Sequence, residues 1–176
     1  MSRYCLETPR LGFRPLTHED EEDVVALNQD PKVMHFFPDV MSVAQSQAYI
    51  EKSMAHFNTY GYSNYAVELK ETNTFIGFMG LLKIGFEHEL KGQVEIGWRL
   101  KKDYWHQGYA VEGARALLDY ASQLGIKEVY SFTAVINLPS EQVMKRIGMT
   151  YVNEFLHPNV EETSVLRPHV LYVKRL

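Results

Sequence analysis

Hydrophobic and polar positions follow two different periods along this chain, and together they predict a mixed domain. Residues 10–16, "RLGFRPL", alternate and end at a proline, which predicts a first strand. Residues 17–28 begin with a threonine followed by acids, which is typical of a helix N-terminus because the helix dipole favours negative charge there. An acidic metal site is the alternative for this run. Residues 30–39 predict a turn-rich loop, and 42–60 predict a second helix. Its apolar stripe consists of Val43, Ile50, Met54 and Phe57.

The remaining patterns predict three strands, a helix, a strand, a helix and two final strands. The runs 64–70 and 75–84 are joined by the short turn "ETNT", which predicts antiparallel neighbours. The later predicted strands are 93–102, 129–137, 150–156 and 167–176. The later predicted helices begin at Gly108, ending near Gly125, and at Leu138, ending before Gly148. This order indicates an α+β (mixed α/β) fold, with a central sheet and helices on its faces.

Composition and charge narrow the class of protein. The length of 176 residues, with 45% apolar residues, fits a single globular domain over residues 1–176. The formal net charge is −4, and neither a basic block nor a long apolar run indicates nucleic acid or a membrane as partner. The first residues lack an apolar signal core. Cys5 is the only cysteine, which rules out an internal disulfide, so we expect a cytoplasmic protein.

The stretch "YWHQGYAVEG", residues 104–113, is the first candidate for chemistry. Gly108 and Ala110 lie where a strand end turns into a helix, and the first amides of a helix form an anion site. A turn that simply needs a glycine is the alternative. The stretch is not a P-loop, because Ala114 and Arg115 follow where lysine and serine or threonine are required, and no G-x-G-x-x-G occurs. The pattern favours binding of a phosphate-bearing carrier over hydrolysis of a nucleotide.

Three ordered motifs carry a family resemblance. "EIGWRL" (95–100), "WHQGYAVEG" (105–113) and "NLPSEQVMKRIGM" (137–149) resemble the acetyl-CoA signature of the GCN5-related N-acetyltransferases (GNAT), in particular the ribosomal-protein N-terminal (RimJ/RimL-type) branch. The start "LETPRLGFRPLTHEDEEDVVAL" resembles that branch too. The resemblance implies a mostly antiparallel, twisted sheet of about six or seven strands, splayed in the middle. Gly113 departs from the usual alanine, at a helix-propensity cost of about 1 kcal/mol, and close packing against the sheet is the expected reason.

The resemblance implies acetyl-CoA as cosubstrate and no metal. The pantetheine arm would pair with the free edge of the strand at Trp98 and Leu100, and the pyrophosphate would bind the amides of 107–111. Asn137 would bond the arm or cap the next helix. Lys145 and His106 would meet the 3′-phosphate or stay solvated. The complete implied cofactor set is Trp98, Arg99, Leu100, His106, Gln107, Gly108, Tyr109, Ala110, Val111, Asn137 and Lys145.

The resemblance also implies three catalytic groups. Glu95 would act as general base, with a pKa raised by partial burial; its alternative is a structural carboxylate. Leu100 N–H would stabilise the oxyanion of the thioester carbonyl. Ser140 is the candidate acid for the leaving thiolate, because Met144 stands where many relatives have a tyrosine; a first-turn helix serine is the alternative. Phe36 and Phe37 would form an apolar wall for the acceptor, or pack in the core.

The expected function is transfer of an acetyl group to a primary amine, on a protein N-terminus or a small molecule, by direct attack in a ternary complex. The alternative is a CoA-binding regulatory or scaffold protein of the same fold without catalysis. We expect neither nucleic acid nor membrane as partner, and a homodimer is possible. The seven histidines are scattered along the sequence and show no metal-ligand spacing.

Overall fold

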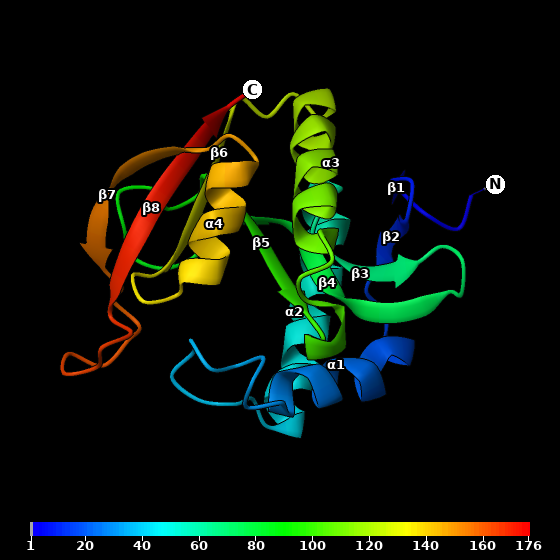
Figure 1. Ribbon diagram of the computed structural model, residues 1–176, viewed down its shortest axis with the longest axis horizontal. Helices are drawn as coiled ribbons and strands as arrows, with labels where there is room; N and C mark the ends of the chain where they lie inside the picture. The colour runs from blue at the N-terminus through cyan, green and yellow to red at the C-terminus, as the bar shows by residue number, and fades with distance from the viewer. Residues whose placement is uncertain (1) are drawn as a thin grey trace.

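The computed structural model describes residues 2–176 and shows a twisted sheet with helices on both faces (Figure 1). Within these residues, eight strands form one sheet in the order β1-β2-β3-β4-β5-β6-β8-β7. The strands are β1 (Leu6–Glu7), β2 (Leu11–Pro15), β3 (Asn64–Leu69), β4 (Thr74–Lys83), β5 (Val94–Leu100), β6 (Glu128–Ala134), β7 (Thr150–Leu156) and β8 (Pro168–Arg175). The helices are α1 (Glu21–Gln29), α2 (Val43–Tyr60), α3 (Tyr109–Gln123) and α4 (Leu138–Arg146), with 3₁₀ turns at His18–Asp20 and Lys102–Tyr104.

The expected mixed fold is confirmed, and the strand number needs a correction. All neighbouring strands are antiparallel except β5 and β6. The sheet has eight strands among residues 2–176, not six or seven, because the two-residue strand β1 adds to the edge of β2. The predicted strand 129–137 is also shorter, since it stops at Ala134 and Asn137 caps α4 instead.

Two hydrophobic cores lie on opposite faces of the sheet. Met79 of β4 packs in the larger core with Leu117 of α3 and Met144 of α4. Its neighbour Phe78 packs in the second core with Ile50 of α2. Side chains alternate between the faces of a strand, so consecutive residues of β4 serve different cores. The site residues of β5 therefore also divide between two faces.

The parallel pair β5 and β6 opens the sheet. The two strands pair only at Val94↔Val129 and Glu95↔Tyr130, and they diverge from there in Figure 1. Beyond Glu95, the side of β5 that faces β6 has no strand partner among residues 2–176. This is the splay that the family resemblance implies.

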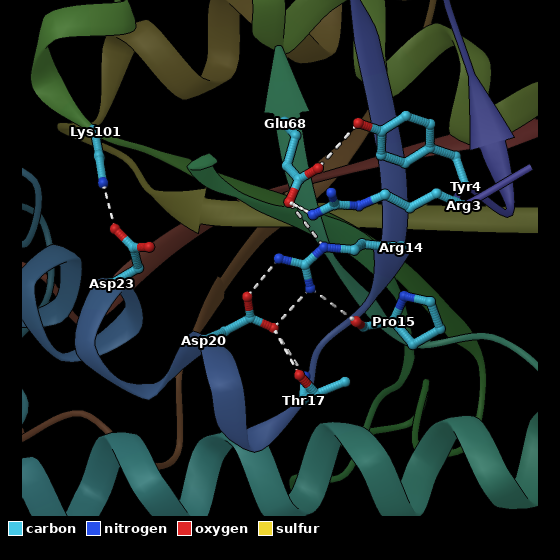
Figure 2. Close-up of polar contacts among 9 residues, drawn as sticks. All are labelled: Arg3, Tyr4, Arg14, Pro15, Thr17, Asp20, Asp23, Glu68 and Lys101. Atoms are coloured by element: carbon cyan, nitrogen blue, oxygen red, sulfur yellow. Dashed lines mark hydrogen bonds and ion pairs between the residues drawn. The ribbon is translucent and has the colours of Figure 1, made fainter. Parts of the chain in front are cut away.

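Ion pairs fix the first helix and the 3₁₀ turn before it against the sheet (Figure 2). Arg14 of β2 donates to both carboxylate oxygens of Asp20, at 2.9 and 2.6 Å, and through Nε to Glu68 of β3, at 2.8 Å. These acceptors raise the pKa of Arg14, with Asp20 as the largest cause. Lys101, just after β5, pairs with Asp23 of α1 at 2.6 Å. The acidic run is thus a helix start held by basic partners. Residues 2–176 contain no group of acids, histidines or cysteines that could hold a metal ion.

The second predicted helix is confirmed, including its ends. Ser42 caps α2 by accepting from the N–H of Gln45, whose side chain bonds back to the N–H of Ser42. Gly61 ends it at a φ of 77°. None of the helices within residues 2–176 has the length and apolar character needed to span a bilayer.

We expect the change Gly113→Ala to lower the free energy of unfolding. A Cβ at this position would lie 2.7 Å from Met79 Sδ and 3.0 Å from Phe13 Cζ. Overpacking typically costs about 1–3 kcal/mol, which exceeds the gain of about 1 kcal/mol in helix propensity. Denaturant unfolding measures the difference. In a Met79→Val background, which removes the clashing sulfur but keeps Phe13, the same change should cost less; an equal cost in both backgrounds would contradict the packing explanation.

Candidate active site

The free edge of β5 presents two unpaired backbone donors. Lys101 N–H donates to Ile76 C=O of β4 at 2.8 Å. Because N–H groups point to alternate sides of a strand, those of Leu100 and Trp98 point away from β4, into the splay. Trp105 Nε1 donates to Leu100 C=O at 2.9 Å and fixes the end of the strand. An extended ligand can therefore pair with these N–H groups of β5, as a neighbouring strand would.

The mouth of α3 is an open helix N-terminus. Gly108 precedes it at a φ of 81°, without a side-chain cap, so the amides of 109–111 lack helical partners. Arg10 Nη1 donates to Gln107 C=O at 2.9 Å and Arg10 Nε pairs with Glu112 at 2.6 Å. Arg10 Nη2 lies 3.4 Å from where a Cβ on Gly108 would stand. Sequence analysis missed Arg10, which stands 97 positions before Gln107.

Ser140 lies beside the splay, at the start of α4. Trp98 Nε1 donates to Ser140 Oγ at 3.1 Å, which joins β5 to α4 across the splay. Asn137 Oδ1 accepts from Ser140 N–H at 3.3 Å, and Asn137 Nδ2 donates to Thr133 at 2.9 Å. Asn137 is therefore a helix cap in this structure, and its contact with the cofactor stays a prediction. Met144 is 1% exposed and belongs to the core.

Glu95 lies on the other face of β5, together with Gly97 and Arg99. Burial raises the pKa of Glu95 to about 7, and Lys52 of α2 opposes the shift. None of the hydrogen bonds and ion pairs within residues 2–176 involves this carboxylate, which weakens its structural alternative. A Cβ on Gly97 would meet nothing within 4 Å. The face of β5 that carries Glu95 therefore has open space above Gly97.

Arg99 was predicted as a cofactor-binding residue, but its side chain points away from the splay. Its side chain turns to α1, where Nη1 donates to Asn28 Oδ1 at 2.7 Å. Phe37 lies over its guanidinium at 4.5 Å from the ring centroid, whereas Phe36 packs against His35 at 4.8 Å. Of the two predicted wall residues, only Phe37 is thus brought next to β5 by a recorded contact. Asn28 was missed, because in the sequence it is an ordinary polar helix residue.

The remaining predicted cofactor residues surround the mouth of α3 or lie on α4. His106 has a φ of 58°, and Gln107 Nε2 donates to Asp103 C=O at 2.8 Å. Tyr109 lies under Arg10 at 4.2 Å. The exposed Lys145 pairs with the half-buried Glu141 at 3.4 Å. The other residues at the mouth, Ala110 and Val111, are half-buried against the larger core. Their contacts with acetyl-CoA stay predictions.

Three of the histidines are not scattered in space, which corrects the sequence-based expectation. They form an aromatic cluster with three phenylalanines of the β4–β5 loop and the last three strands of the chain. The cluster consists of Phe86, His88, Phe132, Phe155, His157 and His169. Burial is the main cause that lowers the pKa of His157 to about 4, so its ring is neutral near pH 7. The cluster packs the β4–β5 loop against the end of β7.

Comparisons with known proteins agree with this geometry. Residues 10–150 match the family model of the acetyltransferase (GNAT) domain. The FsC-acetyl coenzyme A-N(2)-transacetylase of Aspergillus fumigatus is 31% identical over 179 residues, covering 91% of this chain and 73% of that protein. A GNAT-family acetyltransferase from Bacillus anthracis has a TM-score of 0.79 at 25% identity, covering 97% of both chains. The Salmonella typhimurium acetyltransferase that modifies the N-terminal serine of ribosomal protein L7/L12 shares the fold, with a TM-score of 0.78, 15% identity and 96% of both chains covered.

The family match spans all three motifs, and the splayed sheet and open helix mouth fit a CoA ligand. The resemblance to the GNAT superfamily is confirmed, and with it acetyl-CoA as cosubstrate. The chain therefore belongs to the GNAT acetyltransferase family and is an acetyl-CoA-dependent acyltransferase that transfers acetyl groups to amines.

Proposed function

We propose that this enzyme acetylates a primary amine, on a small molecule or a protein N-terminus, by direct attack in a ternary complex. One observation carries the proposal. Strand β5 exposes free N–H groups to the splay at Trp98 and Leu100, while Glu95 lies beside open space on the face of α1 and α2. Acetyl-CoA and the amine can therefore approach β5 from different sides. Direct attack then needs no acetylated enzyme intermediate.

The chain's backbone supplies the cofactor contacts in this proposal. The amides of 107–111 hold the diphosphate at the positive end of α3. The N–H groups of Trp98 and Leu100 pair with the amide and thioester carbonyls of the arm. Acetyl-CoA supplies an activated acetyl thioester. Leu100 N–H stabilises negative charge on the carbonyl oxygen, and losing such a donor typically costs about 2.7–4 kcal/mol of transition-state stabilisation.

Two side chains assist the reaction, one at the attacking amine and one at the departing thiolate. Glu95 accepts a proton from the amine, directly or through a water, because its raised pKa keeps it a useful base near neutral pH. Ser140 donates a hydrogen bond to the departing thiolate. Trp98 Nε1 already donates to Ser140 Oγ, which leaves the hydroxyl proton free to point at the sulfur.

The test is release of free thiol from acetyl-CoA against a panel of amines, including peptides that differ in their first residue. Turnover with at least one amine, lost in Glu95→Gln, supports the proposal. The non-catalytic alternative predicts CoA binding by calorimetry without thiol release above the Glu95→Gln background for every amine.

We expect Ser140→Ala to lower kcat about tenfold to a hundredfold, since a hydrogen bond to a charged group contributes about 1.5–3 kcal/mol. Acetyl-CoA affinity should change little, because the bond forms mainly in the transition state. Steady-state kinetics and calorimetry measure the two quantities. Ser122→Ala, an exposed serine of α3, is the matched control. An unaltered kcat in folded Ser140→Ala would leave solvent as the acid.

A further inference from the structure

Arg99 is a half-buried cation with a buried Nε, and it has no carboxylate partner within residues 2–176. Burial lowers the pKa of its guanidinium, and the only charge effect that opposes this comes from Tyr49, not from an acid. Elsewhere in this chain, arginines near the sheet have acidic partners, as Arg14 does with Asp20. An arginine stays charged in proteins, and a buried charge without a counterion is unfavourable. The structure therefore maintains a positive charge that nothing in it neutralises.

Neighbouring groups hold this guanidinium in place from one side. Nη1 donates to Asn28 Oδ1 at 2.7 Å and to Met41 Sδ at 3.7 Å. Asn28 is fully buried and is itself held by Ser46 Oγ at 3.1 Å. Phe37 and a second ring, Phe78, lie 4.5 and 5.0 Å from the guanidinium carbon. This arrangement orients the group before any ligand binds.

The other edge of the guanidinium is free. Nε is buried and has no hydrogen-bond partner, and Nη2 takes part in none of the hydrogen bonds of Arg99 within residues 2–176. Nε–H and Nη2–H lie in the geometry that matches the two oxygens of a carboxylate. This pre-oriented edge therefore has two donors in the geometry that suits an oxyanion.

This edge shares the face of β5 with the proposed base. Glu95 and Arg99 are four residues apart, about 13 Å along an extended strand, and both affect the pKa of Tyr49. Gly97 lies between them, with open space above it. A small molecule that spans this glycine would place one end at the carboxylate and the other at the guanidinium.

We propose that the acceptor is an amino carboxylate, whose amine faces Glu95 and whose carboxylate is bound by the Nε and Nη2 edge of Arg99. This inference rests on the proposed function, because it names the substrate class of the same site. A polyamine fits poorly, since its second cation would approach the positive charge of Arg99. A peptide N-terminus offers only a neutral carbonyl at this distance, which is a weaker partner than a carboxylate.

The test compares amino acids with their own neutral derivatives. Pairs of β-alanine, γ-aminobutyrate and 6-aminohexanoate with the corresponding amides keep a primary amine and remove the anionic charge. We expect wild-type kcat/KM to favour the acid of the best-fitting length by about 10- to 100-fold, as expected for hydrogen bonds between charged groups. Arg99→Gln should abolish this preference, so that within the variant each acid and its amide have equal kcat/KM. Arg175→Gln, an exposed arginine of β8, is the control and should keep the preference.

Each outcome decides a different claim. Equal kcat/KM for every acid and its amide in the wild type would overturn the inference while acetyl transfer to amines stands. Absence of turnover with all amines, together with intact acetyl-CoA binding, would instead overturn the proposed function. If Arg99→Gln does not fold, Arg99→Lys keeps the charge without the two-donor edge and should reduce the preference. The wild-type comparison needs no variant, so equal values there overturn the inference even if no Arg99 variant folds.

Discussion

Replacement of Glu95 by glutamine is expected to lower kcat by about 10²- to 10⁴-fold, the usual contribution of a general base. Glutamine keeps the shape of the side chain but cannot accept the proton of the attacking amine. Binding of acetyl-CoA should be unchanged, because Glu95 faces away from the splay. Steady-state thiol release and calorimetry measure the two effects. Glu154→Gln, an exposed glutamate of β7, is the control and should behave as the wild type.

The pH dependence distinguishes a base from a structural carboxylate. The wild-type kcat/KM should rise with pH as Glu95 loses its proton, with a midpoint of about 7. Folding raises this pKa, so the folded state holds the proton more tightly than the unfolded state. The free energy of unfolding of the wild type should therefore fall, relative to Glu95→Gln, as the pH rises from 4.5 to about 7. Near-normal activity of the variant at neutral pH would make Glu95 structural.

Replacement of Gly108 by valine is expected to weaken acetyl-CoA binding by about 100-fold, which corresponds to losing two hydrogen bonds to a charged diphosphate at about 1.5 kcal/mol each. A β-branched side chain would cover the amides at the mouth of α3. The substitution is also strained, because Gly108 has a φ of 81°. Titration calorimetry with CoA measures the change.

Backbone strain alone must be separated from loss of the anion site. Gly125 lies just past the other end of α3 at a φ of 80°, with nothing within 4 Å of an added Cβ. Gly125→Val therefore introduces similar strain away from the cofactor and should keep normal CoA affinity. Unchanged affinity in a folded Gly108→Val protein would show that the diphosphate binds elsewhere.

Local sequence patterns predicted most elements, because helices and strands have short periods that neighbouring residues reveal. The helix at 43–60 follows from apolar spacing and from its caps, Ser42 and Gly61. The mouth of α3 follows from small residues at a helix start. Strand β1 could not be predicted, since two residues cannot show an alternation. The end of β6 was placed too late because Asn137 serves as a cap there.

The site shows where sequence alone is insufficient. Trp98 and Arg99 are adjacent in the chain, yet one reaches Ser140 of α4 and the other Asn28 of α1. Arg10 meets Gln107 across 97 positions. The three clustered histidines come from two loops and β8. The sequence by itself determined the elements, the family and the cofactor motifs, all of which depend on short-range order. Only the tertiary structure decided which faces meet, because strand order and burial arise from contacts summed over the whole sheet.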